Sequence, residues 1–135
     1  MLSFFQKKDL PAHLVLGRLG EKIAMRVLEQ HGLELLGSNY NVQGKGEIDI
    51  IARDGFCLCF VEVKTRHHNK ISRPADAVSL AKRKRLLKAS QAYIKETQLP
   101  RSIPMRFDVV EVVFDKKDRL ETVTYLSNFF NKKGL

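Results

Sequence analysis

The sequence predicts an α/β fold, with one mixed central sheet of about five strands flanked by helices. One observation is the order of the periodic segments, which runs helix, three strands, helix, two strands. The other is the run 56–65, which is apolar on both faces until its last residues, as expected of a central strand covered on both sides. With 135 residues, the chain is predicted to be a single domain, 1–135, with its core at about 14–126.

The first half of the chain predicts one helix and a set of antiparallel strands. The helix is expected over 14–31, where apolar residues recur near 3.6 spacing, and Gly32 ends it. Strands are expected over 33–42 and 47–53, and Asp54-Gly55 predicts a tight hairpin into the strand 56–65.

The second half predicts a loop, a long helix and two more strands. The loop covers 66–77 with a turn at Pro74. Ser79 is expected to cap a helix that runs to Gln98. The further predictions are a buried helix side at Leu80, Leu87 and Ile94, strands over 105–114 and 120–126, and a loose tail at 129–135.

Composition excludes several classes of protein. The chain is 44% apolar and 29% charged, so it is not of the disordered type. No apolar run approaches the ~18 residues of a membrane span, and the N-terminal segment does not read as a signal peptide. We therefore expect a soluble cytoplasmic protein with no membrane partner, in which Cys57 and Cys59 are buried, reduced thiols.

Positive charge is concentrated in one segment. The chain carries a net charge of +9, and residues 64–88 hold nine basic residues and one acidic residue. Lys82, Arg85 and Lys88 are expected on one exposed side of the second helix, where Ala89 would leave a flat surface for a phosphate backbone. The alternative is a solvated face that serves solubility only.

Acidic residues interrupt two apolar strands. Glu62 and Lys64 share one face of the strand 56–65, and a buried charge there is costly unless it is paired or binds a metal. A hairpin at Asp54-Gly55 places Asp49 opposite Phe60 and diagonal to Glu62. Two adjacent carboxylates suit Mg²⁺ or Mn²⁺. A structural carboxylate–lysine network is the alternative.

These residues resemble a known group of proteins. Asp49 followed by Glu62-Val63-Lys64 is similar to the D…(D/E)-x-K core of the PD-(D/E)xK nuclease superfamily, with Ile48 in place of the namesake proline. Gly20-Glu21, Gly46-Glu47-Ile48-Asp49 and the segment 60–66 resemble the YraN-like family of predicted bacterial endonucleases, itself distantly similar to archaeal Holliday junction resolvases. The resemblance covers residues 14–126.

The resemblance implies a restriction-endonuclease-like core and a role for each matching residue. Asp49, Glu62 and the Val63 carbonyl would hold Mg²⁺ or Mn²⁺, and Lys64 would orient or help to deprotonate the attacking water. Glu21 matches the first-helix acid of the resolvase-like branch; Gly17 and Ala24 are small neighbours that would let this helix approach the sheet. An ordinary surface glutamate is the alternative for Glu21. Lys82, just after the start of the second helix, is placed as in the family, and the resemblance makes it the basic residue of that helix most expected to contribute to the active site.

The resulting hypothesis is a metal-dependent endonuclease acting on duplex or branched DNA, with a homodimer as a further expected partnership. Two alternatives stay open: a non-catalytic nucleic-acid-binding module with the nuclease fold, and a structural adaptor for another protein. His67 and His68 are expected to be solvated loop residues, and Asp108 is expected to form a structural pair with Arg106.

Overall fold

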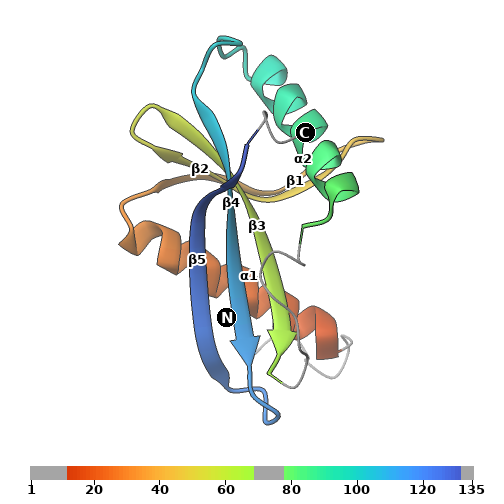
Figure 1. The fold of residues 1–135 in the computed structure, drawn as a ribbon, viewed down its shortest axis with the longest axis vertical. Coiled ribbons are helices and arrows are strands. Elements are labelled where there is room, and N and C mark those ends of the chain that lie inside the picture. Colours follow the sequence, from red (N-terminus) through yellow and green to blue (C-terminus); the bar gives the residue numbers. More distant parts are fainter. Residues whose placement is uncertain (1–11, 69–77, 132–135) are drawn as a thin grey trace.

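The computed structural model describes residues 12–68 and 78–131 (Figure 1). In this part of the chain, no helix is long and apolar enough to cross a membrane. The elements are α1 (Ala12–Gln30), β1 (Glu34–Val42), β2 (Gly46–Asp54), β3 (Cys57–His67), α2 (Leu80–Glu96), β4 (Met105–Phe114) and β5 (Leu120–Phe130).

The five strands form one mixed sheet in the order β1-β2-β3-β4-β5. β3 and β4 are parallel, and the three other neighbouring pairs are antiparallel. The single parallel pair arises because α2 connects β3 to β4 as a crossover, which a parallel connection requires. The predicted α/β class and mixed sheet are thus confirmed.

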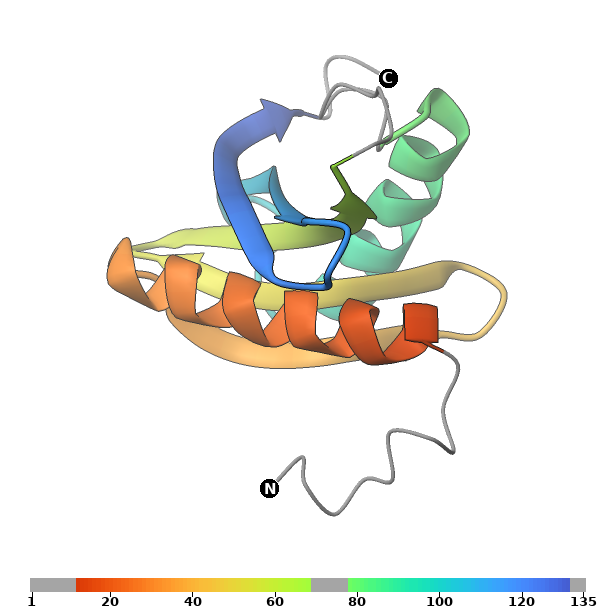
Figure 2. The ribbon, with the colours of Figure 1, turned by 90° about the horizontal axis from the view of Figure 1, so that it is seen from below.

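The two helices cover opposite faces of the sheet (Figure 2). On the α1 face, Ala24 and Leu28 pack with the buried Val61 of β3 and Val110 of β4. On the α2 face, a second cluster gathers around Phe60 and includes the buried residues Leu86 and Ala89 of α2 and Phe107 of β4. Each strand alternates between these two cores, which explains why β3 is apolar on both sides.

α1 ends in a glycine cap, as predicted. Gly32 has φ of +85°, and its N–H donates to the Glu29 carbonyl at 2.9 Å. The N–H of Leu33 donates to the Leu28 carbonyl at 3.1 Å, and both side chains are buried in the same cluster. These contacts form a Schellman motif, which sends the chain directly from α1 into β1.

The hairpin between β2 and β3 turns one residue later than expected. Asp54 pairs with Cys57, so the loop residues are Gly55, with φ of +60°, and Phe56. Phe56 lies in this turn with 90% of its surface exposed, rather than in the strand. The later turn moves every cross-strand partner of β2 by two positions along β3 and leaves the faces unchanged.

The buried side of α2 differs from the expected one. Ser79 caps the helix as predicted, with its side chain accepting from the Lys82 N–H at 3.2 Å. Leu80 is 55% exposed, whereas Ala89, expected on the basic side, is fully buried. Ile94 is buried and Leu87 packs against the same cluster, as predicted, so the difference at Leu80 is confined to the first residue of α2.

Two strands are also longer than predicted. β3 continues through Arg66 and His67 into the expected loop; the rest of that loop, 69–77 with Pro74, lies outside the described residues. β5 runs to Phe130 instead of ending before a loose tail, and residues 132–135 lie outside the described part. The Phe130 ring stacks on Phe107 at 4.5 Å between centroids, which holds the strand end against the core.

Candidate active site

The candidate site lies where β2 and β3 separate. Their pairing ends at Ile50 and Val61, while β3 continues beside β4 as far as His67 (Figure 1). The N–H of Val63 therefore has no ladder partner on β2, and it donates to Asp49 Oδ2 at 2.8 Å. This bond fixes the Asp49 carboxylate in the gap between the two strands.

Asp49 and Glu62 come together at this fork, as the sequence predicted, but by a different register. The observed pairing places Asp49 level with Glu62 rather than with Phe60, because the hairpin turns at Gly55-Phe56. Glu62 is only 4% exposed and Asp49 is half-buried. Burial, followed by the Asp49 charge, raises the pKa of Glu62 to about 8, and its contact with Lys82 acts in the opposite direction.

Glu62 forms an ion pair with Lys82 from the first turn of α2. Lys82 was expected on the basic side of the helix and, among its basic residues, as the one most expected to contribute to the active site. Its side chain is 38% exposed and points to the buried carboxylate, so the expected exposed position is wrong, whereas the expected proximity to the acidic site is observed. The cause is the phase of α2, which turns Lys82 and Leu86, one helical turn apart, toward the sheet side of the helix.

Glu21 of α1 reaches the same fork from the other side. It is half-buried, and its pKa is raised first by burial and then by the Asp49 charge, so the two carboxylates are electrostatic neighbours. The close approach of α1 comes from Gly20, where an added Cβ would lie 2.1 Å from Thr65 Oγ1 of β3. Ala24 is buried as expected, but a Cβ added at Gly17 would meet nothing within 4 Å, so the close approach does not depend on Gly17 and the expectation for it is wrong.

Asn39 is a residue that the sequence analysis missed. With its amide nitrogen directed at the two acids, it donates to Glu21 Oε1 at 3.0 Å and to Glu47 Oε1 at 3.1 Å. It lies within β1 with φ of +51°, a conformation that asparagine tolerates better than most residues. An asparagine inside a strand is the one local signal that could have identified it.

A cavity of about 310 Å³ opens at the fork. Carboxylates form one part of its wall and the cations of α2 the other, so it can hold a group that presents both a cation and an anion. Its lining residues are Gly46, Glu47, Asp49, Glu62, Lys82, Arg85 and Leu86.

The oxygen donors at the fork fit a hard divalent cation. Asp49 and Glu62 supply two carboxylates, and their mutual repulsion contributes to the raised pKa of Glu62. A divalent cation would relieve this repulsion, and all-oxygen ligands suit Mg²⁺ or Mn²⁺. Among the described residues, no three His, Cys, Asp or Glu side chains converge on one metal position, so backbone and water oxygens would have to complete the set.

Lys64 lies two residues beyond Glu62 on the same face of β3. It is exposed, and within residues 12–68 and 78–131 it forms no hydrogen bond or ion pair. Arg85 lines the cavity and Lys88 is exposed one turn further along α2; both are likewise without ion pairs in the described chain. These three cations are therefore available to an anionic ligand.

The two histidines lie outside this cavity. His67 lies at the end of β3 rather than in a loop and pairs with Asp118 at 2.8 Å, whereas His68 lies just after the strand, is exposed as predicted, and pairs with Glu121 at 2.5 Å. Both acids come from the far end of the sheet, where β4 turns into β5, so the pairs tie the end of β3 to that turn.

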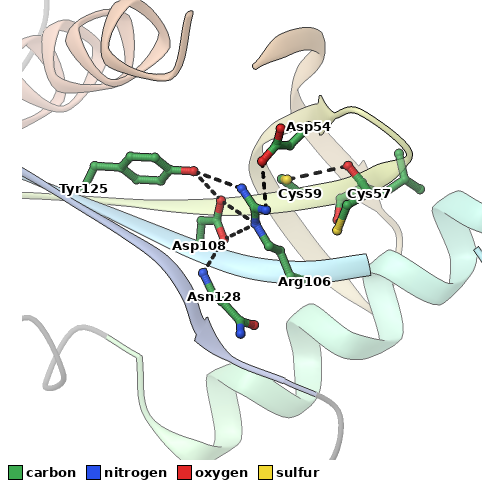
Figure 3. A network of polar contacts seen from close by, with 8 residues as sticks. Asp54, Cys57, Cys59, Arg106, Asp108, Tyr125 and Asn128 are labelled. Carbon is green, nitrogen blue, oxygen red and sulfur yellow. Dashed lines mark hydrogen bonds and ion pairs between the residues drawn. The ribbon is translucent and has the colours of Figure 1, made fainter. Parts of the chain in front are cut away.

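Asp108 forms the structural pair with Arg106 that the sequence predicted (Figure 3). It is fully buried and accepts hydrogen bonds from Arg106 Nε at 3.1 Å, Tyr125 Oη at 2.7 Å and the Asn128 N–H at 2.7 Å. The last bond lies where the β4–β5 register shifts, so Asp108 stabilises this bulge. The nearby Cys59 is a buried free thiol, as predicted, whereas Cys57, also expected to be buried, is a free thiol that is only partly buried.

Comparison with known proteins identifies relatives over most of the chain. The profile of the uncharacterised protein family UPF0102 matches residues 20–112. A UPF0102 protein of Dictyoglomus turgidum is 40% identical over 115 residues, covering 85% of this chain and 96% of that protein. A UPF0102 protein of Chlorobium chlorochromatii is 45% identical over 97 residues, covering 72% and 73%. The matched segment includes Glu21, Asp49, Glu62 and Lys64.

Proposed function

The chain belongs to the uncharacterised protein family UPF0102, and we propose that it is a metal-dependent endonuclease of the PD-(D/E)xK type, hydrolysing phosphodiester bonds in duplex or branched DNA. The observation that supports this most strongly is the fork: Asp49 and Glu62 meet where β2 and β3 separate, beside a cavity, and Lys64 lies two residues further along β3. A purely structural pair of acids would not need an open cavity.

The carboxylates and one backbone oxygen would hold the cation. Asp49, Glu62 and the Val63 carbonyl are the expected ligands, and the Val63 N–H already orients Asp49. When bound, Mg²⁺ or Mn²⁺ supplies Lewis-acid chemistry to the phosphodiester and lowers the pKa of the attacking water. The protein contributes a rigid frame for these ligands, because both strands are hydrogen-bonded to neighbours on their other sides.

Lys64 and Glu21 complete the proposed set. Lys64 presents its ammonium on the Glu62 face, where it can orient the attacking water and stabilise the negative charge that develops on the phosphate. Glu21 is held by Asn39 on the opposite side of Asp49, where it can accept a hydrogen bond from water or from a protonated neighbour.

Arg85 and Lys88 are proposed to bind the DNA backbone. Each contact between a cation and a phosphate releases about one counterion, independently of base sequence. Replacing both by Gln should lower duplex affinity on every sequence alike and flatten the plot of log K against log salt by about 2 units. Fluorescence anisotropy at several salt concentrations measures this slope, and an unchanged slope would mean that α2 does not contact DNA.

A non-catalytic nucleic-acid-binding module is the second candidate. It is favoured by the Lys82–Glu62 pair, which already neutralises one of the two acids without a metal. The two candidates differ in their requirement for a divalent cation. A homodimer stays a prediction, to be measured by sedimentation with and without DNA.

The decisive experiment combines metal binding with cleavage. Labelled duplex, single-stranded, flap and four-way DNA are incubated with wild type, Asp49→Asn and Glu62→Gln, with and without Mn²⁺, and Mn²⁺ affinity is measured by calorimetry. We expect both variants to lose Mn²⁺ binding and cleavage while keeping the fold. Glu29→Gln, an exposed change on α1, serves as the charge-matched control. DNA binding with neither Mn²⁺ binding nor cleavage in wild type would support the binding module instead.

A further inference from the structure

Lys82 occupies an unusual position for a lysine. It lies in the first turn of α2, where the helix dipole disfavours positive charge, and no acidic residue accompanies it in that turn. Its backbone N–H is fixed by the Ser79 side chain at 3.2 Å, so the start of the helix is anchored. The position costs helix stability, which indicates that the charge is needed for its contact with Glu62.

Glu62 depends on this contact for compensation. Within the described chain, Lys82 is the only cation paired with Glu62, while Asp49 opposes it with a like charge. The Val63 N–H is directed at Asp49 and not at Glu62. When Glu62 is ionised, its buried carboxylate requires a positive partner, and Lys82 supplies it in the absence of a metal.

The ammonium of Lys82 could also pair with an anion bound in the cavity. Its side chain is 38% exposed and lines the cavity together with Arg85, one turn further along the helix. A lysine is a flexible point charge that exchanges partners without moving the backbone. A phosphate that enters the cavity beside Arg85 would therefore be within reach of the same ammonium.

We propose that Lys82 is an exchangeable counterion of Glu62. Its ammonium pairs with the carboxylate until a divalent cation binds there, and it then forms an ion pair with a nucleic-acid phosphate instead. The inference rests on the proposed function, since it assumes that Asp49 and Glu62 bind a cation. It makes Lys82 a positioning residue that couples two ligands. Because coupling between sites is reciprocal, DNA strengthens metal binding and metal strengthens DNA binding by the same factor.

The first measurement is Mn²⁺ affinity without DNA, by calorimetry, for wild type, Lys82→Met and Arg85→Met. Lys82→Met removes the competing ammonium and should bind Mn²⁺ about 5- to 100-fold more tightly, the usual range of coupling between two sites. Arg85→Met removes the same charge from the same cavity wall but no partner of Glu62, so it reports the general electrostatic effect, which we expect to be smaller.

The second measurement adds four-way DNA in a Lys64→Ala background, which prevents cleavage. DNA should raise Mn²⁺ affinity more in the Lys64→Ala protein than in the Lys64→Ala/Lys82→Met protein. The double variant has no ammonium at position 82 that could leave Glu62 and pair with a phosphate. Lys82→Gln, which keeps a polar group beside Glu62, repeats both measurements if Lys82→Met does not give a folded circular dichroism spectrum.

The outcomes separate this inference from the proposed function. Tighter Mn²⁺ binding by Lys82→Met than by Arg85→Met supports the exchangeable counterion. Equal or weaker binding by the Lys82 variants, with wild type binding Mn²⁺, overturns it and leaves the metal site intact. If wild type and all variants bind no Mn²⁺, the metal site of the proposed function is overturned as well.

Discussion

Asp108 and Glu62 are two buried acids on adjacent parallel strands, one step apart in the ladder and on opposite faces of the sheet. Asp108 accepts hydrogen bonds from Arg106, Tyr125 and the Asn128 backbone, so its negative charge is fully matched by donors. Glu62 has the like charge of Asp49 on one side and the single ammonium of Lys82 on the other.

The difference separates a structural acid from one available for chemistry. The donors aimed at the Asp108 carboxylate come from β4 and β5, so this acid holds the two strands together. Glu62 is held at a fork with a cavity, where its charge is only partly compensated. A carboxylate left in this state gains most from a ligand that brings positive charge.

The largest expected effect is on stability at the Asp108 network. Asp108→Ala leaves the half-buried guanidinium of Arg106 without its main partner and removes the acceptor of the β5 bulge. We expect a loss of about 3 to 5 kcal/mol in the free energy of unfolding, measured by urea titration. Glu62→Gln, with Mn²⁺ absent, should lose far less; equal losses would remove the distinction between the two acids.

A large effect on rate, without one on stability, is expected at the fork. Lys64→Ala removes an exposed ammonium, so the free energy of unfolding should change by less than about 0.5 kcal/mol. Turnover of DNA should fall by about 10²- to 10³-fold, as when one stabilising charge or donor is removed from a transition state. Mn²⁺ and DNA affinities should be kept. Cleavage at the wild-type rate would exclude Lys64 from the mechanism.

A smaller effect is expected where α1 meets β3. Gly20→Ala places a methyl group against Thr65 Oγ1 and 3.3 Å from Thr65 Cβ, so rotating the hydroxyl away leaves a tight contact with a side chain that is stiff at χ1. The helix must shift, at about 1 to 3 kcal/mol, and Glu21 shifts with it.

Gly17→Ala is the matched control on the same helix, because an added Cβ there meets nothing within 4 Å. It should stabilise the helix by about 0.5 to 1 kcal/mol. If the two variants unfold at the same urea concentration, the close approach of α1 is not what holds Glu21 at the fork.

The last expected effect is a pH dependence that belongs to Glu62. Its folded pKa is raised from 4.5 to about 8, so the folded state binds the proton more tightly than the unfolded state does. The stability of wild type relative to Glu62→Gln should therefore fall as pH rises from about 4.5 to about 8, by at least about 1 kcal/mol. Urea titrations in chelator at several pH values measure this difference. A difference that is flat across this range would show that Glu62 ionises normally.

Much of the fold was predictable because its signals are local. The order of elements, the Gly32 cap and the Ser79 cap follow from periodicity and capping residues, and all are observed. The errors fall where tertiary packing decides. Phe130 joins β5 because it stacks on Phe107, and the hairpin register depends on which two residues form the loop.

The charged residues of the candidate site were predicted from the sequence, whereas some of the residues that position them were not. Asp49, Glu62 and Lys64 could be found because charges are rare in apolar strands, and the match to UPF0102 confirms the YraN-like resemblance at the level of the family. Asn39 and the approach of Gly20 to Thr65 could not be found, since both depend on how β1 and α1 lie against the sheet.

By itself, the sequence determined which elements form and which ionisable groups interrupt the apolar strands, because strand and helix periods are properties of neighbouring residues. Only the tertiary structure decided that Asp49 lies level with Glu62. It also decided that Lys82 forms an ion pair with Glu62 instead of lying on an exposed face of α2. The physical reason is that contacts between β2, β3 and α2 depend on strand register and on the rotation of α2 about its axis. A shift of two residues in the register of β2 against β3 changes the partner of a buried charge while leaving every side chain on the same face of the sheet.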